Sequence, residues 1–152
     1  MCGNVPIFRL SVVVLLAATL VVVSGCNTLG RQPKFKKAEI EPSVLKPGDS
    51  AIITVRLVDK IKTVDKVVGV LPDYPGMKLA LKDDGNPPDE EAGDGVWTLQ
   101  VDVPFMAPPG QFVLDITAFD SDGDVVIVKH SDQSKGPLST TCTLEIQYPP
   151  EQ

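Results

Sequence analysis

From residue 38 onward, apolar and polar residues alternate along the chain in short segments, and this pattern restricts the fold more than any other feature. Successive side chains of a β-strand point to opposite faces, so the alternation predicts strands with one buried and one exposed face. Lys46-Pro47-Gly48-Asp49 and Asp122-Gly123 are typical of the tight turns that join such strands. The predicted strand segments are 38–41, 51–58, 64–71, 77–82, 97–103, 112–118, 125–128 and 142–147.

About seven or eight strands, with turns every ~8–12 residues, predict an all-β fold with a single two-sheet antiparallel sandwich of the immunoglobulin type. The domain would span residues 38–148, followed by a short C-terminal tail at 149–152. Cys142 is the one cysteine in this range, so the core forms without an inter-sheet disulfide. Residues predicted to face the core are Ala38, Ile40, Ile53, Val55, Leu57, Met77, Leu79, Leu81, Trp97, Leu99, Val101, Val103, Phe112, Leu114, Ile116, Ala118, Cys142, Leu144 and Ile146.

An acidic loop, residues 83–95, separates two of the predicted strands. Asp83-Asp84-Gly85 opens the loop and Gly93-Asp94-Gly95 closes it, two residues before Trp97. These residues resemble the Asp-Asp-Gly … Gly-Asp-Gly-x-aromatic segment of bacterial extracytoplasmic Ig-like modules. The resemblance implies that the loop joins two strands and that Trp97 enters the core. Because such modules act as spacers, adhesion parts and binding domains, it indicates a fold more than an activity.

The charged residues of the acidic loop are all carboxylates, which makes the loop a candidate metal site. Ca²⁺ takes six to eight oxygen ligands from Asp, Asn and backbone carbonyl groups. In an Ig-type strand order, residues 120–124 would lie at the same end of the sandwich and add further carboxylates. The alternative is a solvated loop whose Asp side chains bond to their own backbone. No cofactor is required, Ca²⁺ is the candidate ion, and the predicted ligands are Asp84, Asn86, Asp89, Asp94 and Asp122.

Residues 1–25 have the layout of a secretory signal peptide: a short start with Arg9, an apolar run from Leu10 to Val23 and a small-residue exit. The apolar run is shorter than the ~20 residues that a membrane-spanning helix needs. Its exit, Val23-Ser24-Gly25-Cys26, resembles the lipobox of bacterial lipoproteins. The resemblance implies cleavage before Cys26, a diacylglyceryl group on the Cys26 thiol and an acyl chain, such as palmitate, on the new amino terminus. The alternative is an ordinary signal peptide or an uncleaved anchor in which Cys26 has no role.

Residues 26–37 would then be the lipidated cysteine and a basic tether. Arg31, Lys34, Lys36 and Lys37 could bind anionic headgroups, or the segment could be a solvated linker. In Gram-negative lipoproteins, Asp directly after the lipidated cysteine favours retention in the inner membrane, whereas here the residue is Asn27. The expected location is therefore extracytoplasmic, lipid-anchored and in the outer membrane. Because the acidic loop would lie at the tether's end of the sandwich, we expect that loop to face the anchoring membrane.

Several function classes are disfavoured by residue content. The formal net charge of −6 opposes nucleic-acid binding, which depends on neutralising phosphates. Neither a nucleophile elbow nor a phosphate-binding glycine loop occurs, so we expect no enzyme. The single histidine, His130, borders a polar insert at 131–137, and a solvated strand-end position is expected for it rather than a catalytic one. Cys142 shares a face with Leu144 and Ile146, which favours a buried and unreactive thiol.

Three functions remain open. The first is a membrane-anchored lipoprotein whose non-catalytic Ig-like domain binds or spaces an envelope protein or glycan. The second is a Ca²⁺-dependent adhesion or stability module that uses the acidic loop. The third is an accessory subunit of an envelope assembly, which would bind through an exposed sheet edge by strand addition.

Overall fold

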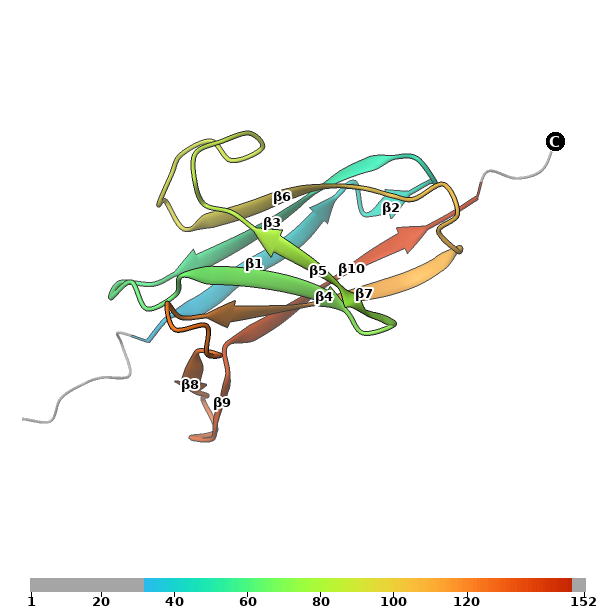
Figure 1. The fold of residues 1–152 in the computed structure, drawn as a ribbon. Helices are drawn as coiled ribbons and strands as arrows, with labels where there is room; N and C mark the ends of the chain where they lie inside the picture. The colour runs from blue at the N-terminus through green and yellow to red at the C-terminus, as the bar shows by residue number, and fades with distance from the viewer. Residues whose placement is uncertain (1–31, 149–152) are drawn as a thin grey trace, which may run out of the picture. The chain divides into compact units, whose positions relative to one another are not determined.

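The computed structural model describes residues 32–148, and these residues form strands and turns without a helix (Figure 1). The all-β class is thus confirmed. The described residues hold ten strands, because two short strands lie where the sequence predicts none. The strands are β1 (Lys34–Glu41), β2 (Val44–Leu45), β3 (Ser50–Val58), β4 (Lys66–Leu71), β5 (Tyr74–Leu81), β6 (Val96–Asp102), β7 (Gly110–Phe119), β8 (Ile127–Lys129), β9 (Lys135–Pro137) and β10 (Ser139–Ile146).

Two larger sheets and one small hairpin account for the ten strands. One sheet has the order β1-β3-β6, the second has the order β2-β10-β7-β4-β5, and β8 pairs with β9. All pairs are antiparallel except β2 with β10. Figure 1 shows the two larger sheets as separate layers, with β5 and β6 as the edge strands on one side.

The core lies between the two larger sheets and is built from the alternation that the sequence predicts. In β3, Ile53 and Val55 are buried while Ile52 and Arg56 are exposed. In β7, Leu114, Ile116 and Ala118 are buried. The pattern weakens in the edge strand β5, where Leu81 is buried but Met77 is 45% exposed. An edge strand has a neighbour on one side only, so fewer side chains cover its inner face.

The ordered domain begins earlier than predicted. The sequence assigns residues 26–37 to a tether, but β1 starts at Lys34 and Pro33 is already buried. Phe35 is the cause, since it packs against the core and pairs with Leu57. A register shift between Phe35 and Lys37 interrupts the alternation, so the sequence pattern does not predict a strand in this lysine-rich stretch. The side-chain amide oxygen of Gln32 accepts a hydrogen bond of 2.6 Å from the Lys129 N–H.

The polar insert at 131–137 is also more regular than predicted, because it contains β9. The β8–β9 hairpin joins a second apolar cluster that lies at one end of the core. That cluster consists of the buried residues Leu57, Ala118, Val126, Val128 and Leu138.

Strand pairing fixes which loops share an end of the domain. The start of β1 pairs with the end of β3, and the end of β3 also pairs with the start of β6. The end of β7 pairs with the start of β4. The acidic loop, the 59–65 segment, the 120–126 segment and the first described residues therefore lie at one end, which we call the acidic tip (Figure 1). The turns at 72–73 and 103–109 lie at the opposite end.

The described residues, 32–148, belong to one compact unit. The predicted signal peptide at 1–25, the lipobox with Cys26 and the first part of the tether lie outside the described range, as does the 149–152 tail. Within residues 32–148, no helix is long and apolar enough to cross a membrane.

Candidate functional site

Asp83 organises the acidic loop by accepting backbone hydrogen bonds from the loop's far side. Its Oδ1 accepts the Gly93 N–H at 2.7 Å, and its Oδ2 accepts the Gly95 N–H at 3.1 Å. The backbone of Gly95 also approaches β3, because its carbonyl oxygen accepts the Leu57 N–H at 2.8 Å. Gly93 and Gly95 both have positive φ angles, of 77° and 85°, which glycine adopts without steric cost. Asp83 thus closes the loop onto the start of β6.

Asp89 is the most buried carboxylate of the loop, with 5% of its surface exposed. Its Oδ2 accepts the Gly85 N–H at 2.6 Å, and its own N–H donates to the Asn86 carbonyl at 2.8 Å. Asp94 is exposed, and its Oδ1 accepts the Val96 N–H at 2.8 Å. Each of these carboxylates keeps an oxygen lone pair available beyond its backbone bond.

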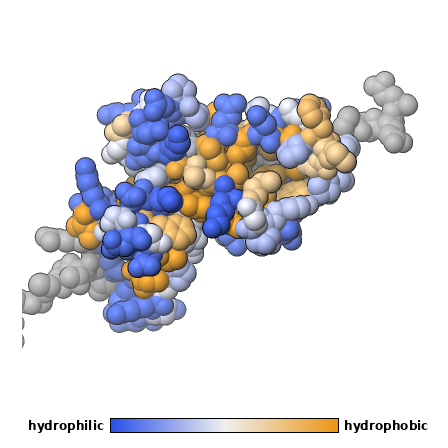
Figure 2. Space-filling model, viewed as in Figure 1, coloured by the Kyte–Doolittle hydropathy of each residue, from blue (hydrophilic) through white to orange (hydrophobic). Residues whose placement is uncertain are grey.

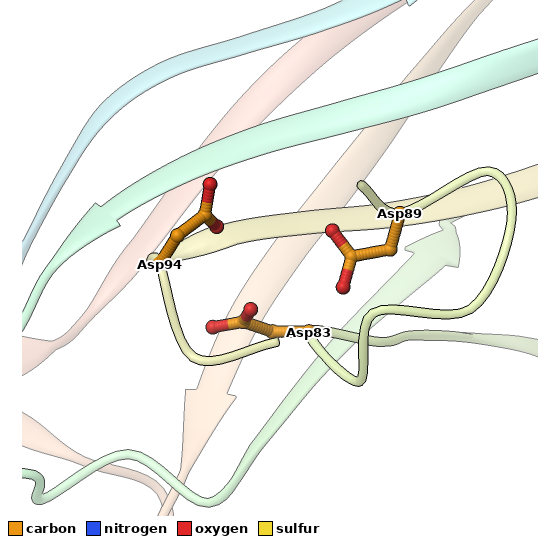
Figure 3. Close-up of side chains that lie close together, drawn as sticks. All are labelled: Asp83, Asp89 and Asp94. Atoms are coloured by element: carbon orange, nitrogen blue, oxygen red, sulfur yellow. The ribbon is translucent and has the colours of Figure 1, made fainter. Parts of the chain in front are cut away.

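The loop brings Asp83, Asp89 and Asp94 together (Figure 3). One carboxylate oxygen from each residue lies within 4.8 Å of the others. Oxygen atoms from three carboxylates form the kind of donor set that hard cations such as Ca²⁺ prefer. The sequence predicts two of the three members, Asp89 and Asp94. It misses Asp83, because the side chain joins the group only when the loop folds back on β6.

The other three predicted ligands are not part of this group. Asp84 Oδ1 accepts the Asn86 N–H at 3.0 Å, and the pKa of Asp84 is lowered by its bonds to Asn86 and by the nearby Lys82. Asp122 lies in a separate turn, where its N–H donates to Asp120 Oδ1 at 3.0 Å. These contacts are the backbone-capping interactions that the alternative interpretation of the loop expects.

A second candidate site lies on the open side of the domain, between the edge strands β5 and β6. Lys82 and Thr98 join these strands through backbone hydrogen bonds near the acidic tip. Toward the opposite end lies an apolar cleft of about 330 Å³, which Figure 2 shows as an apolar band bordered by polar side chains. The residues that line the cleft are Ile40, Leu45, Ile53, Leu71, Tyr74, Met77, Leu79, Val101, Asp102, Val103, Pro104, Met106, Ala107, Pro108, Phe112, Leu114, Leu144 and Ile146.

Asp102 is the one charged residue in the lining of the cleft. Its Oδ1 accepts a hydrogen bond of 2.6 Å from the Ser50 hydroxyl. At the same end of the domain, Phe105 is 83% exposed and Met106 is 92% exposed. The sequence predicts a proline-rich turn here but not the cleft, since the cleft depends on how β5 and β6 are placed relative to each other in the folded domain.

Cys142 and His130 occupy the positions expected for them. Cys142 is buried in the core, and burial raises the pKa of its thiol to about 11. Because thiolate is the reactive form, a thiol with this pKa reacts slowly at neutral pH. His130 is exposed at the end of β8, where its backbone N–H donates to the Ser134 carbonyl at 2.8 Å.

No protein-family model and no curated protein matches the chain. Among solved structures, the fold is similar to the alkylpurine DNA glycosylase AlkC from Pseudomonas fluorescens, with 15% identity, a TM-score of 0.43 and 76% of this chain covered. The match spans 30% of the glycosylase. A Niemann-Pick type C2 protein from the Japanese carpenter ant has 14% identity and a TM-score of 0.45, with 76% of this chain and 92% of the ant protein covered. At these scores, neither likeness indicates a function for this chain.

Proposed function

We propose that the chain is a lipid-anchored extracytoplasmic protein whose non-catalytic domain binds a partner molecule in the cleft between β5 and β6. The cleft carries this proposal. Ligand sites are typically concave, largely apolar and ~300 Å³ or more in volume, and the β5–β6 cleft has these properties. A domain that only spaced other components would gain nothing from an open apolar interior, which exposes hydrophobic surface to water.

We further propose that the domain is an immunoglobulin-like sandwich. Two sheets facing one core support this assignment, as do the orders β1-β3-β6 and β2-β10-β7-β4-β5. In such sandwiches the loops gather at two ends, so one domain can present different surfaces toward its anchor and away from it. The first described residues lie at the acidic tip, which supports an orientation with the tip toward the membrane and the 103–109 turn away from it.

The anchor is tested on the full precursor with the Cys26→Ser substitution, which removes the thiol that lipidation requires. We expect the wild-type chain to incorporate labelled palmitate and to sediment with membranes, and the variant to do neither. Two or more acyl chains are needed for stable attachment, so loss of the modification should release the protein. Wild-type protein that sediments with membranes without incorporating label, or a Cys26→Ser variant that still incorporates label, would contradict lipidation at Cys26.

The orientation is tested separately, by crosslinking from a lipid-borne probe to residue 89 at the tip and residue 107 at the opposite end. We expect shorter distances to residue 89. Shorter distances to residue 107 would contradict the proposed orientation but not the proposed lipid anchor.

A second candidate function is cation binding at the acidic tip, with Ca²⁺ as the ion. The approach of Asp83, Asp89 and Asp94 to within 4.8 Å favours it. The test is thermal unfolding of the chain from residue 26, carrying Cys26→Ser, in EDTA and then in millimolar Ca²⁺ or Mg²⁺. At 100 times its dissociation constant a ligand stabilises the folded state by ~2.7 kcal/mol, which raises the melting temperature by several degrees. An unchanged melting temperature in Ca²⁺ would mean that the loop is a solvated turn without a bound cation.

A further inference from the structure

Resting on the proposed binding function of the cleft, we infer that its ligand is the aliphatic chain of a lipid with an uncharged head group. The apolar base of the cleft supports this ligand class. It includes Leu114 and Ile53, which are fully buried residues, so a ligand in the cleft would rest on the apolar core. A cleft of about 330 Å³ has room for a slender ligand rather than for a folded surface.

The chemistry of the lining also favours a hydrocarbon over a peptide. The walls are formed almost entirely by aliphatic, aromatic and methionine side chains. A peptide strand could pair along the free edge of β5 or β6, but its backbone groups that point into the cleft would meet only apolar side chains, whereas a hydrocarbon chain has no polar group to satisfy. Met77 and Met106 line the entrance, and their flexible thioethers can pack against chains of different lengths.

The head group is restricted by charge. Asp102, the one charged lining residue, is exposed near the cleft and is hydrogen-bonded to Ser50. A carboxylate at the head of the ligand would meet the Asp102 carboxylate and be repelled, whereas a hydroxyl head could donate a hydrogen bond to it. A monoacylglycerol has this chemistry, and a fatty acid anion does not.

The turn beside the cleft is held in place while its apolar tip remains exposed. The Ala107 N–H donates to the Pro104 carbonyl at 3.0 Å, and the Tyr148 hydroxyl donates to the Ala107 carbonyl at 2.9 Å. Met106, which lines the cleft, is therefore presented to solvent from a fixed position, and the exposed Phe105 precedes it in the same turn. They offer an apolar contact for the part of a lipid chain that has not yet entered the cleft.

The test uses the chain from residue 26 with Cys26→Ser and the uncharged fluorescent probe N-phenyl-1-naphthylamine. Leu79→Trp and Val101→Phe fill the cleft from its two edge strands. Their matched controls, Ala80→Trp and Gln100→Phe, place the same side chains on the exposed outer faces of the same strands. Monoacylglycerols of increasing chain length and the corresponding fatty acids then compete with the probe below their micelle-forming concentrations. Circular dichroism confirms that each variant is folded.

We expect probe binding that either cleft-filling variant abolishes and both controls retain. Monoacylglycerols should displace the probe, with about fourfold tighter binding for each added methylene until the cleft is full. Fatty acids should compete more weakly, and Asp102→Asn should remove that difference. Equal competition by both lipid classes in the wild-type protein would overturn the inference on the head group.

Different results would overturn the proposed binding function of the cleft and the proposed lipid ligand. Probe binding that Leu79→Trp abolishes but no lipid displaces would overturn the aliphatic ligand and leave the binding site in place. Absence of probe binding, or binding that survives in both filled variants, would overturn the proposed function of the cleft together with the inference.

Discussion

Lys82 and Thr98 exchange two backbone hydrogen bonds, with N···O distances of 2.9 and 2.8 Å, and so join the edge strands of the two larger sheets. This contact divides the open side of the domain. On one side of it the acidic loop folds back over the start of β6, and on the other side the apolar cleft opens. The contact therefore separates a polar candidate site from an apolar one.

The Thr98 hydroxyl lowers the stability of the folded protein, and a substitution should reveal this effect. The residue is 6% exposed, and its hydroxyl oxygen has no hydrogen-bond partner among the described residues. Thr98→Val keeps the shape and replaces the hydroxyl by a methyl group, so we expect the free energy of unfolding to rise by about 1 kcal/mol. Urea unfolding measures the change, with Thr54→Val, its half-buried cross-strand neighbour, as the control. A loss of stability in Thr98→Val would mean that the hydroxyl has a partner.

The two glycines that end the acidic loop should respond differently to the same substitution. Both have positive φ angles, so Ala strains the backbone by ~1–2 kcal/mol at either position. A Cβ at Gly95 would also lie 2.5 Å from the Leu57 carbonyl oxygen, whereas a Cβ at Gly93 meets nothing within 4 Å. We expect Gly95→Ala to lower the free energy of unfolding by about 3 kcal/mol or more, and Gly93→Ala to lower it by about 1 kcal/mol. Equal losses in chemical denaturation would contradict the close approach of Gly95 to β3.

Local patterns were sufficient to predict the central strands of the fold. In β3 and β7 the inward residues are covered by neighbours on both sides, so burial follows the alternation closely. The same rule predicted Met77 as a core residue, but β5 is an edge strand and Met77 lies 45% exposed. The core contact of Phe35 was not predicted, because a single aromatic residue among lysines does not form an alternating pattern.

The residues of the candidate sites could be predicted only in part from such local patterns. Asp89 and Asp94 could be predicted as members of an acidic cluster from their loop alone. Asp83 and Asp84 are adjacent and chemically identical, so only the folded loop determines that Asp83 joins the cluster. The cleft depends on how β5 and β6 are placed relative to each other, which no stretch of sequence encodes locally.

The acidic tip leads to a test in which one substitution has opposite effects with and without a cation. Asp94→Asn keeps an oxygen that can accept the Val96 N–H but removes one of three clustered charges. Without added metal we expect a stability gain of up to about 1 kcal/mol from reduced repulsion. In millimolar Ca²⁺ we expect the stabilisation seen in the wild-type protein to be lost.

The control for this test is Asp122→Asn, which changes a carboxylate at the same end of the domain but outside the cluster. Differential scanning calorimetry in EDTA and in Ca²⁺ compares the three proteins. A Ca²⁺ shift that is lost equally in both variants would indicate a general charge effect instead of a site.

The Cys142 thiol gives a prediction for alkaline pH. Its pKa is raised from 9.0 to about 11 in the folded protein by burial, so the folded state holds the proton more tightly than the unfolded state. The resulting stabilisation is complete below pH ~9 and is lost as the pH rises through about 11, with a total of ~2–3 kcal/mol. Cys142→Ala lacks this contribution, so the stability difference between the two proteins should shrink over that range. A constant difference from pH 8 to 11, measured by urea unfolding, would contradict the raised pKa.

The most direct test of the binding function is a two-dimensional amide NMR titration of the chain from residue 26, carrying Cys26→Ser, with a monoacylglycerol below its micelle-forming concentration. We expect saturable shifts for the amides of Leu79, Val101 and Ala107 in the cleft, and unchanged positions for those of Gly85 and Gly93 in the acidic loop. Shifts confined to the acidic loop, or no saturable shift in the cleft, would contradict a lipid-binding site between β5 and β6.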